Sequence, residues 1–221
     1  MVGLQSALRQ NKVLKALDIS GNNEMLNEDF EESVKFFDAL GSNDTLLSLN
    51  LHETNLWDEN VEALVQALRA NTALQSIDLS ATQLFEKDVL VLAHALGLNN
   101  ALTSLSLKDN ELNARSVKAL ADALAINTTL RLLNLSNICI NGNQMECLVK
   151  ALQENSTLTC IDLTENGVGT PGASALISAL RVNTALKSLH ITPRMMPEAY
   201  CLELEQVCKE RGVSYNTHPL D

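Results

Sequence analysis

The sequence predicts an α/β solenoid, a right-handed arc in which short strands form one parallel sheet on the concave face and helices cover the convex face. Three observations predict it: one phrase recurs along the chain, its copies have a nearly constant period, and each period combines two hydrophobic spacings. The copies begin at Asn11, Asn43, Asn71, Asn99, Asn127, Asn155 and Asn183, so the interval is 28 residues five times after a first interval of 32. A period of this length indicates one supersecondary unit repeated along the chain.

The first half of each period has the alternating spacing of a short strand. In the second copy Leu46 is followed by Leu49 and Leu51, and the last two are separated by one residue. Side chains two positions apart lie on the same face of a strand, so this face is expected to be buried. The positions between them are mostly short and polar in all copies. Such residues suit the opposite face of the sheet if that face is in contact with water.

The second half of each period has helical spacing. Val61, Leu64 and Ala67 are three residues apart and Leu68 follows directly, which places them on one stripe of a helix that packs against the strand. The penultimate position of the stripe is alanine in every complete copy: Ala39, Ala67, Ala95, Ala123, Ala151 and Ala179. Small residues in this column allow neighbouring helices to approach closely.

The pattern L-x-x-L-x-L-x-x-N, followed by a helix that ends in A-L-x-x-N, resembles the ribonuclease-inhibitor-like subclass of leucine-rich repeats. The relatives include ribonuclease inhibitor, the sensor arms of NOD-like receptors, Ran GTPase-activating protein and the C-terminal domain of tropomodulins. The resemblance spans residues 4 to about 192. It implies a protein–protein interaction module that binds its partner on the concave face. Two alternatives remain: a GTPase activator of the Ran type, with Arg115 as the arginine that reaches the partner, and a structural or sensor segment of a larger receptor or effector.

In leucine-rich repeats an Asn or Thr three residues after the second strand Leu or Ile bonds the backbone of adjacent turns, which a buried irregular segment requires. The corresponding residues here are Asn22, Thr54, Thr82, Asn110, Ile138, Asn166 and Arg194. Five of these seven can make such bonds, whereas Ile138 and Arg194 cannot continue the ladder in the same way.

The whole chain, residues 1–221, is predicted to be a single domain of this repeat. Residues 1–10 are expected to form an N-terminal helix that is either a cap or a truncated repeat. Residues 11–192 are expected to hold seven strand units with six strand–helix repeats. Residues 193–221 are expected to form a C-terminal capping helix, from about Glu198 to Arg211, and a tail.

The composition restricts the partner and the location. A formal net charge of −11 disfavours nucleic acid, because an acidic surface cannot gain the counterion release that drives phosphate binding. A basic protein partner is favoured instead. No apolar stretch is long enough to insert in a membrane, and the first residues lack the pattern of a signal peptide. Five scattered cysteines have no metal or disulfide spacing, so a cytoplasmic protein with reduced thiols is expected.

No group of residues predicts catalysis, a metal site or a small-molecule cofactor. Cys201 and Cys208 are seven residues apart and are interpreted as packed thiols of the capping helix. His52 and His190 occupy strand positions five repeats apart, which separates them by roughly 24 Å and prevents them from sharing a metal. The chain is therefore not expected to be an enzyme.

The candidate partner-binding residues lie on the concave strand positions and in the loops that follow them. They are Asp18, Asn50, His52, Glu53, Trp57, Asp78, Phe85, Lys108, Asp109, Asp162, Glu165 and His190. Trp57 and Phe85 occupy the same position of consecutive repeats, where later copies have Asn113, Asn141 and Gly169. Because the core does not require an aromatic residue there, the two side chains are either exposed binding anchors or a pair that stacks to shield the helix starts.

Overall fold

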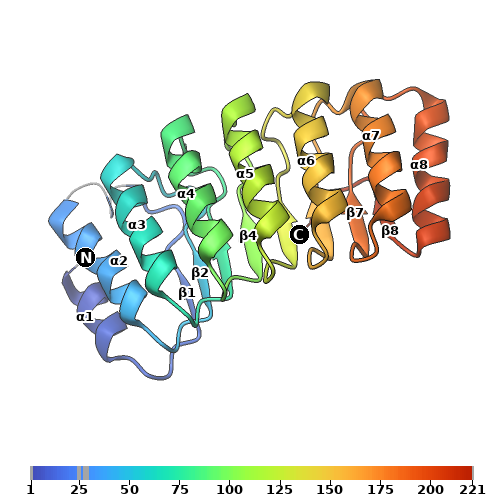
Figure 1. Cartoon of the computed structure of the whole chain (residues 1–221). Helices are drawn as coiled ribbons and strands as arrows, with labels where there is room; N and C mark the ends of the chain where they lie inside the picture. The colour runs from blue at the N-terminus through green and yellow to red at the C-terminus, as the bar shows by residue number, and fades with distance from the viewer. Residues whose placement is uncertain (1, 24–25, 27–29, 221) are drawn as a thin grey trace.

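The computed structural model describes residues 2–23, 26 and 30–220, and in this part of the chain helices and short strands alternate regularly (Figure 1). The helices are α1 (Val2–Gln10), α2 (Phe30–Ser42), α3 (Asp58–Ala70), α4 (Glu86–Leu98), α5 (Ala114–Ile126), α6 (Gly142–Glu154), α7 (Gly169–Val182) and α8 (Glu198–Arg211). The strands are β1 (Ala16–Asp18), β2 (Ser48–Asn50), β3 (Ser76–Asp78), β4 (Ser104–Ser106), β5 (Leu132–Asn134), β6 (Cys160–Asp162), β7 (Ser188–His190) and β8 (Ser214–Asn216).

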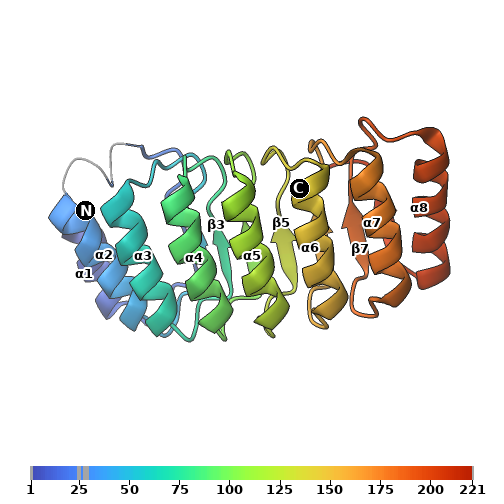
Figure 2. The same cartoon turned by 45° about the horizontal axis from the view of Figure 1, so that its top comes forward.

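The strands form one parallel sheet in the order of the sequence, and the helices lie side by side on one of its faces (Figure 2). Successive strands pair in a register that places each buried residue beside its repeat equivalent, as in Leu49 with Ile77 and Ile77 with Leu105. The predicted α/β solenoid, with its parallel sheet and its outer layer of helices, is confirmed.

The sheet contains one strand more than the sequence predicted. After the capping helix, β8 pairs with β7, and the N–H of Ser214 donates to the carbonyl of Lys187 at 2.7 Å. The N–H of Ile191 in turn donates to the carbonyl of Asn216 at 2.9 Å. The seven strands expected within residues 11–192 correspond to β1–β7, whereas β8 lies in residues 193–221, where a capping helix and a tail were expected. The sequence did not indicate β8 because this strand lacks the L-x-L signature and is held by backbone pairing, which no side-chain pattern announces.

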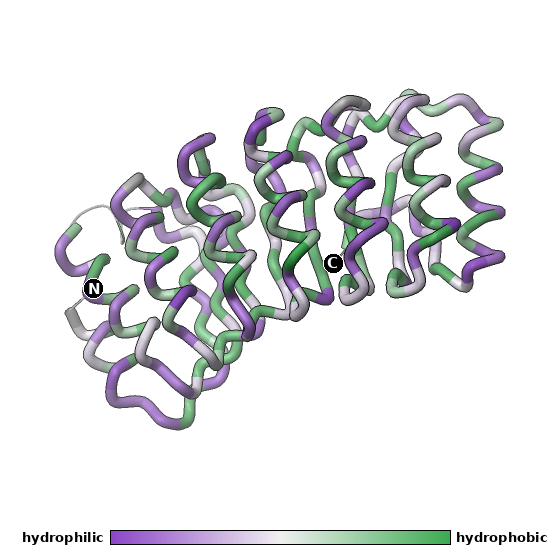
Figure 3. Tube along the Cα trace, in the orientation of Figure 1, coloured by the Kyte–Doolittle hydropathy of each residue, from purple (hydrophilic) through white to green (hydrophobic). Residues whose placement is uncertain are grey.

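The leucine columns form one continuous core between sheet and helices. Leu79, Leu107 and Leu135 are buried at equivalent positions, as are the columns of Leu64 and Ala67 on the helices. Along the chain, apolar residues alternate with polar ones at the period of each element (Figure 3). The core is almost wholly aliphatic, which agrees with the low aromatic content of 3%.

The asparagine that begins each phrase holds neighbouring repeats together. Asn71 donates from Nδ2 to the carbonyls of Leu40 and Asn43, at 2.6 and 2.8 Å, while its Oδ1 accepts the N–H groups of Ala73 and Leu74. The equivalent asparagine of each later copy donates to the leucine carbonyl 31 residues earlier and accepts the same two N–H groups. A buried amide that uses both its donor and its acceptor satisfies several backbone groups of the turn at once.

Three residues after the strand, Thr54, Asn110 and Asn166 bond the backbone of the preceding repeat as expected. The hydroxyl of Thr82 instead donates to the carbonyl of Leu79 in its own turn. Asn110 donates to the carbonyl of Leu79 at 2.8 Å, and Asn166 donates to that of Leu135 at 2.7 Å. At the interrupted position the backbone compensates, because the N–H of Leu112 donates to the carbonyl of Ile138 at 3.4 Å, whereas its repeat equivalent Leu84 donates to Oδ1 of Asn110. The departure at Ile138 therefore leaves no gap in the backbone hydrogen bonding of this turn.

The two ends of the array are built differently. At the C-terminal end α8 buries Leu204, Val207 and Cys208 against α7, and Gly212 ends it in the left-handed conformation with φ 66°. At the other end α1 packs against α2, yet Leu14 keeps 40% of its surface exposed, whereas its repeat equivalent Leu186 keeps 3%. α8 spans the residues where the sequence predicted a capping helix, and it packs against the helix of the last repeat.

Candidate protein-binding surface

The concave surface is organised by one recurring turn at the last residue of the strands. Oδ1 of an Asp or Asn accepts the backbone N–H two residues later, at Asp18, Asn50, Asp78, Asn134 and Asp162, with distances of 2.8 to 2.9 Å. This is an Asx turn, which bends the chain out of the strand. The hydrogen bonds from Ser20 hold the pKa of Asp18 below its ordinary value. The turn occupies one side-chain oxygen and leaves the second polar atom for other contacts.

In the C-terminal half these second atoms are covered by the chain's own tail. Oδ2 of Asp162 accepts the backbone N–H of Leu220 at 2.7 Å, and Asp162 is completely buried. Nδ1 of His190 contacts the carbonyl oxygen of His218 at 2.8 Å. Asp162 and His190 were expected to face a partner on an open surface. This expectation was wrong for Asp162, because alternation assigns a side chain to a face but cannot show what else folds onto that face.

The open part of the concave surface is a groove of about 400 Å³ that begins beside the tail. Of the predicted residues it brings together Asn50, His52, Asp78 and Lys108. The rest of its lining is Ser76, Ile77, Ser80, Ser104, Ser106, Leu132, Asn134 and Leu220. Since Leu220 belongs to the tail, the groove and the covered half form one continuous strip across the strands.

The acidic character of this face is partly neutralised within the chain. Glu165 pairs with Arg194 at 2.7 Å, and Asp109 lies 3.9 Å from Nζ of Lys108 and accepts a hydrogen bond from Asn137. With Asp162 buried as well, the accessible acidic residues of the concave side are concentrated at its N-terminal end.

That N-terminal acidic group consists of Asp18, Glu53 and Asp78, none of which is buried. Within it, Asp18 accepts a hydrogen bond from Asn50 at 3.1 Å, and Glu53 lies 3.4 Å from Nε2 of His52. The charge predicted for the whole concave face is thus carried by one half of it.

Two large aromatic side chains lie exposed on the rim next to this acidic half. Trp57 and Phe85 are 60% and 62% exposed, and they are the N-cap residues of α3 and α4. Among the described residues the aromatic rings in contact are those of Phe36 and Phe37, so Trp57 and Phe85 do not stack on each other. Of the two alternatives for this pair, the structure favours exposed side chains over a stacked shield.

The next repeat shows what the local structure prefers at this position. Asn113 is the N-cap of α5, and its Oδ1 accepts the N–H groups of Arg115 and Ser116 at 3.0 Å each. Trp57 and Phe85 make no such cap. The N–H of Phe85 donates instead to the carboxylate of Asp88 at 2.9 Å, and burial raises the pKa of Asp88. The aromatic residues therefore occupy positions where asparagine would serve the helix better.

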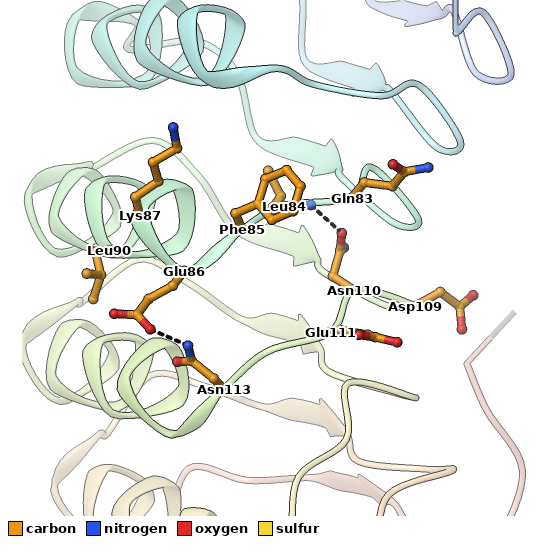
Figure 4. A pocket seen from close by; sticks show the side chains of 10 residues that line it. All are labelled: Gln83, Leu84, Phe85, Glu86, Lys87, Leu90, Asp109, Asn110, Glu111 and Asn113. Carbon is orange, nitrogen blue, oxygen red and sulfur yellow. Dashed lines mark hydrogen bonds between the residues drawn. The ribbon is translucent and has the colours of Figure 1, made fainter.

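A groove of about 840 Å³ lies between the loops that precede α4 and α5, with Phe85 on its wall (Figure 4). In this view Glu86 and Asn113 point toward each other and are hydrogen-bonded, while Lys87 points away on the other side. The remaining lining residues are Gln83, Leu84, Leu90, Asp109, Asn110 and Glu111. Of the lining residues, Phe85 and Asp109 are among the candidate partner-binding residues that the sequence indicated. The repeat period was the available signal, because Glu86 and Asn113 are 27 residues apart and come from adjacent turns.

Two residues considered for chemistry are held in structural contacts. Arg115, the arginine of the GTPase-activator alternative, pairs with Glu86 of the neighbouring repeat at 3.0 Å. Cys208 is buried, and burial raises the pKa of its thiol to about 11. A thiol with so little thiolate at neutral pH is a poor nucleophile, which agrees with the interpretation of Cys208 as a packed residue.

No helix within the described residues is long and apolar enough to cross a membrane.

Comparison with known proteins supports the repeat directly. A family described as leucine-rich repeat matches residues 98–121 and 154–176. The chain has a leucine-rich-repeat fold. Of the two matched segments, the first extends from the end of α4 through β4 into α5, and the second covers β6 and the first half of α7. Curated protein sequences contain no match to the chain.

Solved structures share this fold at low sequence identity. Actin-binding site 2 of leiomodin-1 superposes with a TM-score of 0.60 at 18% identity, covering 67% of this chain and 86% of that one. The tropomodulin C-terminal domain of Caenorhabditis elegans gives 0.61 at 15% identity, covering 69% and 92%. TLR13, in its complex with ssRNA13, gives 0.52 at 22% identity, covering 80% of this chain and 23% of that one. These structures share the repeat fold of this chain.

Proposed function

We propose that this leucine-rich-repeat chain is a non-enzymatic protein-binding module whose partner contacts the rim at Trp57 and Phe85 and the adjoining open half of the concave face. One observation carries the proposal. Two aromatic side chains are more than half exposed at helix N-caps, where the next repeat uses Asn113 to cap its helix. Neither packing nor helix capping explains an aromatic residue there, whereas partner binding does.

The chemistry of the surface describes the partner. Trp57 and Phe85 require apolar pockets, and Asp18, Glu53 and Asp78 favour basic groups beside those pockets. The net charge of −11 favours a basic partner in the same way and disfavours nucleic acid. The five cysteines are free thiols, which suits the reducing cytoplasm as the place where the module works.

Actin is the first partner to test, because one of the similar structures is named as an actin-binding site. An unbiased affinity capture with mass spectrometry, using the purified chain as bait, provides the other candidates. A protein obtained in this way counts as the partner only if its binding depends on the rim residues.

The deciding experiment is the double variant Trp57→Asn, Phe85→Asn. The partner's Kd should rise by about 30-fold or more, the equivalent of about 2 kcal/mol, because binding anchors are lost. Thermal stability should stay the same or increase, since asparagine at an N-cap stabilises a helix by about 0.5–2 kcal/mol relative to a residue that cannot cap.

The matched control is Leu98→Asn, Ile126→Asn, which removes exposed apolar side chains from the C-terminal ends of two helices; these side chains are 58% and 66% exposed. Binding should be unaffected in this control. The single tryptophan of the chain gives an independent signal, because its emission should shift to the blue when the partner covers it. Unchanged affinity in the rim variant, together with an unresponsive Trp57, would refute the proposal.

A further inference from the structure

The chain places one of its own segments on its concave face. After α8 the backbone forms β8 along β7, and residues 217–220 then run back toward the middle of the array. Figures 1 and 2 both show the C-terminal end level with α6 rather than beside α8. Leu220 is hydrogen-bonded to Asp162, which lies 58 residues earlier in the chain and two strands away from β8.

Residues of the concave face bind this segment through its backbone. The carbonyl of His218 can only accept a hydrogen bond, so Nδ1 of His190 is the donor to it. Nε2 of the same ring is then the acceptor for Nδ2 of Asn216, at a distance of 3.3 Å. Oδ2 of Asp162 accepts the N–H of Leu220. The face thus recognises an extended backbone by one donor and one acceptor, while the side chain of Leu220 lies at the edge of the open groove.

The open half offers the same arrangement without an occupant. Asp78 stands at the position of Asp162 three strands away, and in both residues Oδ1 accepts the N–H of the Asx turn. Among the described residues no group donates to Oδ2 of Asp78, the atom that corresponds to the acceptor used by Leu220. The groove that contains Asp78 also begins at Leu220, so a segment lying along it would continue the path of the tail.

We infer that the concave face binds an extended polypeptide segment of the partner and that residues 217–220 are an internal occupant of the C-terminal part of this site, which the partner's segment displaces. The inference rests on the proposed function for the existence of a partner, but the role of the tail stands on its own contacts. Thr217, His218 and Pro219 are exposed, and the segment is attached beyond β8 through backbone contacts to two side chains. A segment held by so few contacts opens far more readily than the core.

The first test is the variant Asp162→Asn, measured by amide hydrogen exchange of Leu220 in the NMR spectrum of the full chain. Asparagine keeps the Asx turn, as Asn134 does with the N–H and hydroxyl of Ser136, but its Nδ2 cannot accept from Leu220. Exchange of the Leu220 amide should become about tenfold faster or more, while core amides remain unchanged. The control Asp78→Asn should leave Leu220 protected. Equal protection of Leu220 in wild type and Asp162→Asn would overturn the inference.

The second test removes the occupant by ending the chain after Asn216, which keeps β8. Carbodiimide labelling of carboxylates should then reach Asp162, which is buried in the full chain. Affinity for the partner should rise severalfold in the shortened chain, because displacing the tail no longer opposes binding. Unlabelled Asp162 or unchanged affinity would overturn the inference. The Trp57→Asn, Phe85→Asn variant tests binding at the rim alone. Unchanged affinity in that variant counts against the proposed function, whereas unlabelled Asp162 in the shortened chain counts against the tail as an internal occupant.

Discussion

The N-terminal and C-terminal halves of this solenoid have the same core and different surfaces. Leu49 and Leu189 are equally buried at equivalent strand positions, and the same asparagine contacts recur from Asn71 to Asn183. The concave side nevertheless is open and acidic over β1–β4 and covered by the tail over β6 and β7. A repeat therefore reproduces its interior from unit to unit, while each exposed face is free to acquire its own contacts.

The ends differ in the same way. α8 and β8 cover the last repeat, whereas Leu14 and Leu17 at the first strand remain partly accessible. In a solenoid each unit is stabilised mainly by its neighbours, so the burial of a leucine depends on its place in the array as well as on its column in the repeat.

Leu186→Ala should lower the free energy of unfolding by about 2–5 kcal/mol, because a fully packed leucine is replaced by a cavity. Leu14→Ala, in the same column of the repeat, should cost less than half as much, because Leu14 is already 40% exposed. Leu107→Ala in the middle of the array should behave like Leu186→Ala. Denaturant unfolding measures all three, and equal losses at Leu14 and Leu186 would contradict the difference between the two ends.

Asp18→Asn combined with Asp78→Asn should slow partner association by about threefold to tenfold at low salt, because these charges lie on the open half. The control is Glu62→Gln combined with Glu146→Gln, which removes the same net charge from two exposed residues of the helices. This pair should slow association less, because the helices lie on the other side of the molecule. Stopped-flow association at several salt concentrations distinguishes the two. Equal slowing by both pairs would mean that net charge rather than the concave face steers the partner.

Asp88→Asn should stabilise the chain at pH 7 by a few tenths to about 1 kcal/mol. Burial raises the pKa of Asp88 above 3.8, so the folded state favours the protonated acid, and this contribution is lost as the pH rises through the raised pKa. Near pH 3 the variant should show no advantage. Gln144, the neutral residue in the same column, accepts the equivalent N–H from Asn141, so Gln144→Glu should be less stable at pH 7 than at acidic pH. Thermal unfolding across this pH range measures both variants.

The sequence alone determined the repeat, the alternation of strand and helix, the buried columns and the capping helix. It could do so because each depends on local spacing: two residues for a strand face, three and four for a helix stripe, and 28 for the unit. The equivalence of Trp57 and Phe85 followed from the same register. Their solvent exposure needed the structure, since two rings at one repeat position can either stack or separate.

Which candidate residues a partner can reach depends on contacts between segments that are distant in the sequence. Asp78 and Asp162 have identical places in the repeat, yet one faces an open groove and the other is buried under Leu220. β8 and the tail are held by backbone hydrogen bonds, which carry no side-chain period, and their partners lie between 25 and 58 residues away in the sequence. A hydrophobic pattern specifies what a segment buries beneath itself, but it does not specify which other segment will fold over the polar face that remains.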